Sequence, residues 1–213
     1  MTVVAEDNKV RIVKLELNEW NTNAYIIVCK VTGESMVVDA PGKVDEIVKN
    51  LEGTRPRLIA ITHGHMDHIE VLAKLKKELR VPVAMHPLDA GPVNIKPDIE
   101  LYDGAVLTIG KLQIDVLHTP GHTEGSVSLL IDNYLISGDT LFPGGPGRTR
   151  TPEELKTLIY TLVTKIFVLP DIIRILPGHG EPTILGKEKR EFDVFSSKTH
   201  DGDLCGDVLW LTS

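Results

Sequence analysis

One short stretch carries most of the side chains in this sequence that could hold a metal ion. The apolar residues 58–61 are followed at once by the pattern H-x-H-x-D-H, formed by His63, His65, Asp67 and His68. Imidazole and carboxylate groups are the ligands that suit zinc and neighbouring first-row metals. The last two of these residues are adjacent and cannot easily point where the first two point. The motif therefore indicates two metal positions.

Three further candidate ligands lie downstream, each directly after an apolar run typical of a strand. They are His122, Asp139 and His179. A glycine precedes each of them and allows a tight backbone turn and a close approach to an ion. Taken singly, a histidine after Pro-Gly is more often an ordinary loop residue. Seven ligand-type residues at four strand ends indicate a metal centre instead.

The composition is that of an ordinary globular protein. A length of 213 residues provides for one substantial core, and shares of 42% hydrophobic and 25% charged residues are typical of such chains. We therefore expect a single domain over residues 1–213. The net charge of −7 and the lack of an evident basic face argue against nucleic acid as the main partner.

Nothing in the sequence indicates a membrane protein or a secreted one. No apolar run approaches the ~20 residues that span a bilayer, and residues 1–7 lack the pattern of a signal peptide. The two cysteines, Cys29 and Cys205, are isolated and imply no disulfide framework. We expect a cytoplasmic protein that acts on a small-molecule substrate and contacts no membrane.

The apolar periodicity predicts two successive groups of strands, each accompanied by helices. In the first group we expect strands over residues 10–17, 23–31, 36–39, 58–61 and 81–85, and helices over 44–51 and 69–79. In the second we expect strands over 105–109, 112–117, 127–131, 134–136 and 172–176, and helices over 151–166 and 186–192. Residues 87–104 predict an irregular segment, and residues 198–213 match no pattern. Two groups of mostly antiparallel strands with helices on one side predict a four-layer α/β/β/α sandwich.

The order of these motifs resembles the metallo-β-lactamase-fold superfamily, from about Val10 to Gly186. The resemblance rests on Thr62-His-Gly-His-Met-Asp-His68, Gly121-His122, Gly138-Asp139 and Gly178-His179. It implies a first metal held by His63, His65 and His122, a second held by Asp67, His68 and His179, and Asp139 as a bridge. It also implies two divalent ions, zinc in the first instance, with iron or manganese as alternatives.

The resemblance assigns supporting positions to other residues. Asp39 resembles the superfamily's first aspartate, which orients a ligand from behind the metal. His86 and His118 match no ligand, and either could touch the substrate or support a ligand. We expect His200 to be exposed. The run Val208–Leu211 could pack on a second copy of the chain, so a homodimer stays open.

The chemistry that the resemblance implies is hydrolysis by a hydroxide that bridges the two metals, with Asp67 orienting it. The run 138–142, followed by Gly147-Arg148, resembles the hydroxyacylglutathione hydrolase (glyoxalase II) branch, which cleaves a thioester. Thr149-Arg150 replace the aromatic and acidic residues expected next, and the sequence after His179 is too short for that branch's helical domain. We therefore expect hydrolysis of a thioester or ester with an unassigned acyl group. The two arginines could meet an anionic substrate or be solvated charges.

Four other functions remain open from the sequence. A lactonase, or a promiscuous β-lactamase-type hydrolase, would use the same dinuclear site. A mononuclear iron persulfide dioxygenase would use only the equivalents of His63, His122 and Asp139, so the second metal position discriminates it from a hydrolase. A phosphodiesterase of the RNA-processing type would need an added arm and a basic surface. A non-catalytic member usually loses ligands, and none is lost here.

Overall fold

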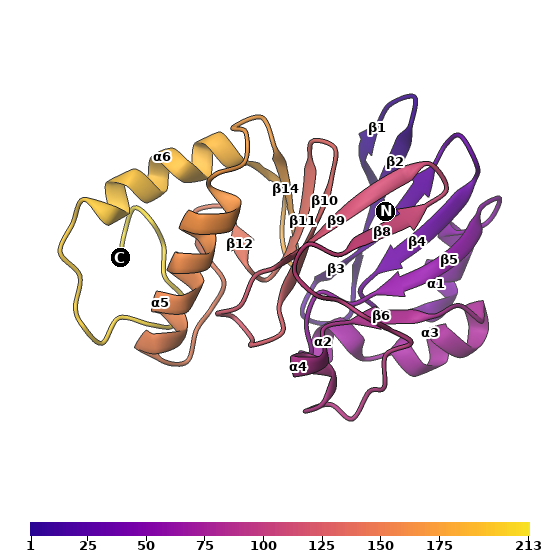
Figure 1. Ribbon diagram of the computed structural model, residues 1–213, viewed down its shortest axis with the longest axis horizontal. Helices are drawn as coiled ribbons and strands as arrows, with labels where there is room; N and C mark the ends of the chain where they lie inside the picture. The colour runs from indigo at the N-terminus through magenta and orange to yellow at the C-terminus, as the bar shows by residue number, and fades with distance from the viewer.

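The computed structural model describes residues 1–213 and places two β-sheets face to face between two outer layers of helices (Figure 1). Helices α5 and α6 cover the outer face of one sheet, and α1 and α3 lie against the other (Figure 1). This is the predicted four-layer α/β/β/α arrangement. No helix in the structure is both long enough and apolar enough to cross a lipid bilayer.

The first sheet has seven strands in the order of the sequence. They are β1 (Thr2–Glu6), β2 (Val10–Leu17), β3 (Thr22–Cys29), β4 (Glu34–Val38), β5 (Arg55–Ala60), β6 (Val83–Met85) and β7 (Ile99–Glu100). The pairs from β1 to β4 are antiparallel, as expected, but those from β4 to β7 are parallel. The expectation of mostly antiparallel strands was therefore wrong for half of this sheet. The connections after β4 and β5 carry helices, and such crossovers return the chain to pair in parallel.

The second sheet has six strands and contains the remaining ligand loops. Its order is β15 (Thr183–Ile184), β14 (Arg174–Pro177), β11 (Tyr134–Gly138), β10 (Val127–Ile131), β9 (Leu112–His118) and β8 (Val106–Ile109). Only β11 and β14 pair in parallel, with α5 in the connection between them. A small hairpin of β12 (Leu141–Phe142) and β13 (Gly145–Pro146) follows β11.

The helices agree with the sequence pattern in place but not always in length. They are α1 (Val44–Asn50), α2 (Met66–Ile69), α3 (Leu72–Leu79), α4 (Pro87–Ala90), α5 (Pro152–Thr161, continued by a π-helical turn over Leu162–Ile166) and α6 (Leu185–Ser196). The helix expected over 69–79 is shorter than predicted, because α3 begins at Leu72 and Ile69 belongs to the separate short helix α2. The segment 87–104, expected to be irregular, contains α4 and β7. Thr151 caps α5 by accepting a hydrogen bond from the backbone of Glu154, as the capping box predicts.

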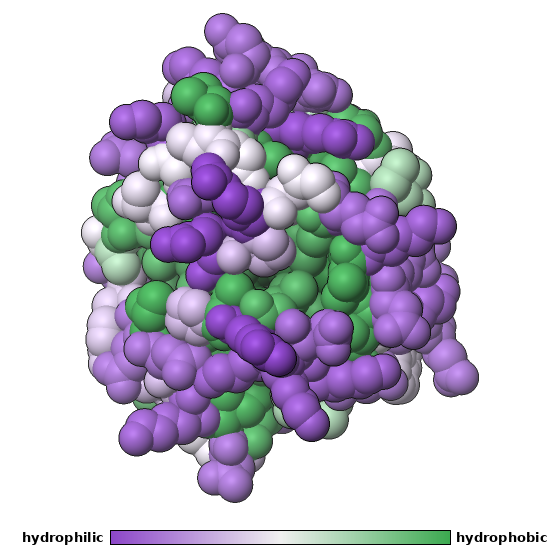
Figure 2. All heavy atoms as spheres, turned by 90° about the vertical axis from the view of Figure 1, so that its right-hand side faces the viewer, coloured by the Kyte–Doolittle hydropathy of each residue, from purple (hydrophilic) through white to green (hydrophobic).

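The buried apolar side chains form three layers, which is what four layers of secondary structure require. One cluster, with Ile12, Ile27 and Leu129, lies between the sheets. A second joins the first sheet to α1 and α3, and a third joins the second sheet to α5, α6 and Trp210. Polar and charged side chains cover most of the face on the side of α1 and α3, with apolar groups visible between them (Figure 2).

A candidate metal centre between the sheets

All seven predicted ligands lie together at one end of the two sheets. The H-x-H-x-D-H motif follows the end of β5, and the other three ligands lie at or just after the ends of β9, β11 and β14. Three overlapping groups have all their ligand atoms within 4.8 Å of one another: His63 with His65 and His122, His63 with His68 and Asp139, and Asp67 with His68 and His179. The structure thus brings together every residue that the sequence proposed.

The first group has the geometry of a three-histidine site. The Nδ1 atom of His65 lies 2.9 Å from the Nε2 atom of His122. The ring of His63 lies 4.8 Å from that of His65 and 4.9 Å from that of His122, each nearly perpendicular to it. The Nε2 atom of His63 is buried and has no hydrogen-bond partner. A buried, unpaired imidazole nitrogen facing two others is what a metal ion would satisfy.

The second group combines a carboxylate with two imidazoles. The Oδ2 atom of Asp67 lies 3.2 Å from His179 Nε2 and 3.6 Å from His68 Nε2. The Nε2 atom of His68 is also buried without a hydrogen-bond partner. Like the first group, this group therefore contains a buried imidazole nitrogen without a hydrogen-bond partner, here next to the carboxylate of Asp67.

Asp139 lies between the two groups, as expected of a bridge. Its Oδ1 atom is 3.4 Å from His68 Nε2, and its Oδ2 atom is 3.6 Å from the Nε2 atoms of both His122 and His179. A Cβ atom at Gly178 would overlap the Asp139 carboxylate. The glycine before His179 is therefore required by the close packing of the ligands themselves.

Hydrogen bonds orient four of the five histidines in one common way. Each of these four bonds an oxygen through Nδ1: His63 the hydroxyl of Thr62, His68 the carboxylate of Asp39, His122 the carbonyl of Arg148 and His179 the carbonyl of Trp20. A hydrogen held on Nδ1 leaves the lone pair of Nε2 free to bind a metal. In all four the free Nε2 points at the shared centre, so the donor set fits two divalent cations.

Asp39 supports the second position from behind, as the sequence predicted. It is buried, and its Oδ2 atom accepts hydrogen bonds from His68 Nδ1 and from Thr62 Oγ1, both at 2.8 Å. Its Oδ1 atom accepts from the backbone N–H of Thr62 at 2.8 Å. One carboxylate thus fixes the ring of His68 and the start of the ligand motif.

Asp89 supports the first position, and sequence analysis missed it. This residue of α4 is 6% exposed. Its carboxylate accepts hydrogen bonds from the backbone N–H of Gly64 at 2.8 Å, from Thr123 Oγ1 at 2.7 Å and from the backbone N–H of Gly125 at 2.6 Å. Gly64 lies between two ligands of the first motif, and Thr123 and Gly125 follow His122. Asp89 therefore joins the two loops that build the three-histidine group.

Strand β3 anchors the loop that carries His179. The side-chain amide of Asn23 donates to the carbonyls of Pro177 and Gly180, both at 2.9 Å. The hydroxyl of Tyr25 donates to Pro177 at 2.7 Å, and the backbone N–H of Asn23 donates to Gly178 at 2.7 Å. Side chains of the first sheet thus hold a ligand loop of the second.

The two groups differ in their electrostatics. Burial, together with the neighbouring histidines, holds the pKa of His63 well below 6.5, and burial and His122 lower the pKa of His65. Burial acts in the same direction on His68, but the carboxylates of Asp39 and Asp139 outweigh it and raise its pKa to about 10. The pKa of Asp139 stays below its ordinary value despite burial, because His68 lies beside it. Without metal, these shifts favour neutral imidazoles at His63 and His65 and a protonated imidazole at His68.

The other candidate residues take different places. His86 caps α4 and stacks on His118, with ring centroids 4.2 Å apart and 7° between the planes, away from the ligands. His200 was expected to be exposed but is half-buried, because it stacks on Phe195 at 3.9 Å and bonds its carbonyl. Arg150 lies at the centre: its Nη2 atom is 3.3 Å from His65 Nε2.

Two cavities open on the ligands, one on each side of His122. The first, of about 300 Å³, is lined by polar groups that include His65, Thr123, Arg150 and Glu154. The second, of about 290 Å³, is lined by Asp139, His179, the β12–β13 hairpin and residues 207–209. Together they offer room for a small substrate on both sides of a reacting bond.

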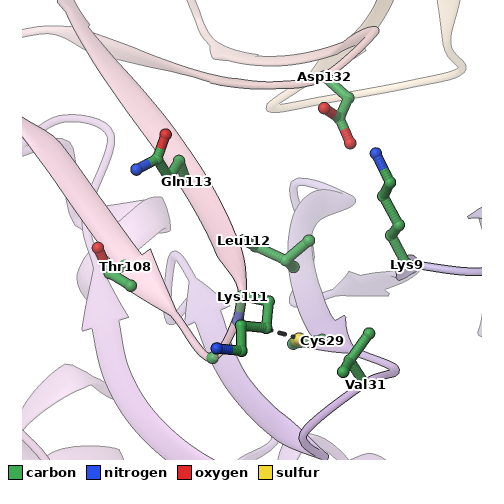
Figure 3. Close-up of a pocket in the computed structure, with 9 residues that line it drawn as sticks. Lys9, Cys29, Val31, Thr108, Lys111, Leu112, Gln113 and Asp132 are labelled. Carbon is green, nitrogen blue, oxygen red and sulfur yellow. Dashed lines mark hydrogen bonds between the residues drawn. The ribbon is translucent and has the colours of Figure 1, made fainter.

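A larger cavity of about 520 Å³ lies at the opposite ends of the strands and contains no predicted ligand (Figure 3). Cys29, at the end of β3, lines it together with Lys9, Lys111 and Asp132. Burial opposes ionisation of Cys29, but hydrogen bonds from Thr32 and from backbone N–H groups lower its pKa to about 7. This cavity is remote from the metal centre.

Comparison with known proteins decides the family. The family model described as the metallo-beta-lactamase superfamily matches residues 17–179, which include all seven ligand positions. The chain belongs to this superfamily. A curated relative, hydroxyacylglutathione hydrolase GloC of Haemophilus influenzae, is 29% identical over 187 residues that cover 76% of this chain and 88% of the relative.

Solved structures of the superfamily share the fold. The B3 metallo-beta-lactamase BLEG-1 is 29% identical and superposes with a TM-score of 0.74, over 84% of this chain and 96% of that one. The protein TTHA1623, solved in a di-iron-bound form, is 28% identical with a TM-score of 0.69, over 84% and 97% of the two chains. The predicted fold and the predicted family are therefore confirmed, and the chain is a metallo-hydrolase of this superfamily.

Proposed function

We propose that this protein is a dinuclear hydrolase that cleaves a thioester or ester of a small acyl compound. The observation that carries the proposal is the orientation of the histidines: four Nδ1 hydrogen bonds leave four Nε2 atoms, two of them buried and unpaired, directed at one centre. Divalent cations bound there would bring a water to a pKa of about 7 and supply positive charge for the substrate carbonyl oxygen and the leaving group.

The residues of the chain would position this water and the substrate. Asp67 contacts His179 and the Thr22 hydroxyl through Oδ2, so its other oxygen is available to accept a hydrogen bond from the attacking water. This would orient the lone pair of the water oxygen towards the carbonyl carbon. The role proposed for Asp67 is therefore orientation as well as metal binding.

Arg150 would bind an oxygen of the substrate. If His65 uses Nδ1 to bind metal, its Nε2 atom keeps a hydrogen and cannot accept a bond from the Arg150 guanidinium, 3.3 Å away. The guanidinium then has free donors at the edge of the polar cavity. An anionic or carbonyl oxygen of the acyl part would satisfy them. Arg148 instead pairs loosely with Asp207 at 3.7 Å on the surface.

Support for the thioester comes from one named relative and from motif similarity. The relative from Haemophilus influenzae is described as a hydroxyacylglutathione hydrolase, and glutathione esters are thioesters. Zinc is the metal we propose, and iron is the alternative because TTHA1623 is described in a di-iron-bound form. The proposed partner is a small molecule, not a nucleic acid.

The proposal is tested by turnover of three substrate classes by one metal-loaded sample. The two thioesters, S-lactoylglutathione and a simple acyl thioester, should be hydrolysed with a higher kcat/KM than an aliphatic lactone, and treatment with a chelator should abolish all three. A preference for the lactone would replace the thioesterase with a lactonase. Absence of hydrolysis, with oxygen uptake in the presence of a persulfide, would overturn the hydrolase.

A further inference from the structure

The C-terminal segment, residues 202–211, lies beside α5 and α6 and is fixed in place (Figure 1). Thr149 and Gly206 exchange two backbone hydrogen bonds, of 3.2 and 3.0 Å, and the backbone N–H of Trp210 donates to Gly144 at 2.8 Å. The indole of Trp210 is fully buried, 5.3 Å from the rings of both Phe192 and Phe195. Aromatic packing and backbone hydrogen bonds therefore fasten the segment at both ends.

Between these ends, the segment packs closely against the β12–β13 hairpin, which lies beside the ligands. A Cβ atom at Gly145 would overlap the carbonyl oxygen of Val208, so only glycine permits this approach. Val208 is buried, whereas Leu209 is 50% exposed. Leu209 lines the cavity that contains Asp139 and His179.

The lining of this cavity contains more apolar residues than that of the cavity on the other side of His122. Opposite the ligands, its wall consists of Phe142, Pro143, Pro146, Val208 and Leu209. Apart from the ligands, its charged residues are Arg148 and Asp207, a mostly exposed pair that contributes little binding energy. Its volume of about 290 Å³ is at the lower end of the roughly 300–1,000 Å³ of ligand pockets. It suits a short apolar group.

We propose that this cavity binds a short aliphatic group next to the reacting ester or thioester bond, and that Leu209 determines the preferred length of that group. The inference rests on the proposed hydrolase function and adds the class of substrate. The aliphatic group belongs either to the acyl part or to the leaving group. The polar cavity with Arg150 then takes the other, polar part of the substrate.

The test uses the metal-loaded full chain and two series of thioesters. In one, the acyl chain grows from acetyl to hexanoyl with the thiol unchanged; in the other, an alkyl thiol grows with acetyl unchanged. In one series kcat/KM should rise about fourfold per methylene, which corresponds to ~0.8 kcal/mol per buried CH₂. That series identifies which part of the substrate lies in the cavity.

Leu209→Ala should flatten this dependence on length, and Leu209→Trp should reverse it by filling the cavity. Leu211→Ala is the matched control, because Leu211 is 54% exposed on the same segment but does not line the cavity. Leu211→Ala should show the same dependence of kcat/KM on chain length as the unchanged protein. The same slope in Leu209→Ala as in the unchanged protein, or equal losses in both alanine variants, would overturn the proposal.

Calorimetric binding of straight-chain carboxylates, from acetate to hexanoate, separates this inference from the proposed reaction. Affinity should rise with chain length in the unchanged protein and in Leu211→Ala, but not in Leu209→Ala. If this holds while no thioester is hydrolysed, the proposed function fails and the aliphatic site stands. If affinity does not depend on length, the aliphatic site is wrong even when thioesters are hydrolysed.

Discussion

The two ligand groups both contact Asp139 but differ in composition and in electrostatics. In the first, burial lowers the pKa values of His63 and His65, and Asp89 holds the two ligand loops together through backbone N–H groups. The second mixes a carboxylate with His68 and His179, whose pKa values nearby carboxylates raise. Asp39 bonds a ligand ring there directly.

Because of this difference, we expect metal binding at the two positions to depend differently on pH. Neutral imidazoles are ready to bind a cation at pH 7, whereas imidazolium groups must first lose protons. We therefore expect the first position to fill more readily at neutral and mildly acidic pH. The second position should gain more from alkaline pH and should release protons when it fills.

The largest effect is expected from Asp139→Ala, because this carboxylate contacts ligands of both groups. Metal content should fall at both positions, and turnover should fall by more than the roughly 10–100-fold that loss of a supporting group costs. Metal analysis after dialysis, with thioester turnover of the same sample, measures both. Loss of one metal only would show that Asp139 belongs to one position.

The two supporting carboxylates offer a paired comparison. Asp89→Asn should weaken the first metal by roughly 10–100-fold and leave the second nearly unchanged. Asp39→Asn should weaken the second metal by a similar factor and the first by less, because Asp39 also bonds Thr62, which orients His63. Stepwise metal titration of both variants, with circular dichroism as the control for folding, distinguishes the positions. If both variants weakened the same step, the separate support of the two positions would be refuted.

The stability of the metal-free protein should depend on pH in opposite ways for the two positions. The pKa of His63 in the folded protein is below 6.5. Its contribution to the free energy of unfolding is therefore present above pH 6.5 and is lost as the pH falls below that value. The pKa of His68 in the folded protein is about 10. Its contribution to the free energy of unfolding is therefore fully present below pH 6.5 and is lost as the pH rises from 6.5 through 10. The free energy of unfolding should therefore peak near pH 6.5 and fall towards pH 10.

Urea denaturation of chelator-treated protein between pH 5 and pH 10 measures this curve. His68→Gln should remove most of the alkaline decline, and His63→Gln should reduce the acid decline. A curve that rises steadily to pH 10 would contradict the raised pKa of His68.

The smallest effect is expected from Arg148→Ala at the rim between the two positions. Its side chain and that of Asp207 are 72% and 75% exposed and 3.7 Å apart. An ion pair this open to solvent stabilises a fold by about 0–1 kcal/mol. Thermal denaturation should therefore shift little, and the metal content should stay the same. A loss of metal would assign Arg148 a role that its position does not indicate.

The ligand motif and the layers could be predicted from sequence because their signals are local. Apolar runs that end in histidine or aspartate identify both a strand and the edge at which it delivers a side chain. Capping at Thr151 is equally local, since it needs only a hydroxyl three residues before the N–H that it accepts from. These features needed no knowledge of what packs against them.

The features that were missed depend on contacts between distant segments. Asp89 stands in a stretch rich in Pro, Asp and Gly with no ligand spacing, and only the fold brings it to Gly64 and Gly125. Residues 198–213 matched no element, and only the structure shows that Val208 and Trp210 are buried while Leu209 and Leu211 are exposed, because all four are apolar in the sequence. The parallel pairing of β4 with β5 likewise follows from the crossover helix and not from strand composition.

The most direct test of the dinuclear hydrolase is metal content per chain together with thioester turnover, for the unchanged protein and for His179→Ala. We predict about two metals per chain with turnover in the first, and about one metal with turnover lost in the second. One iron per chain in the unchanged protein, with no hydrolysis and no change on substitution of His179, would contradict the account.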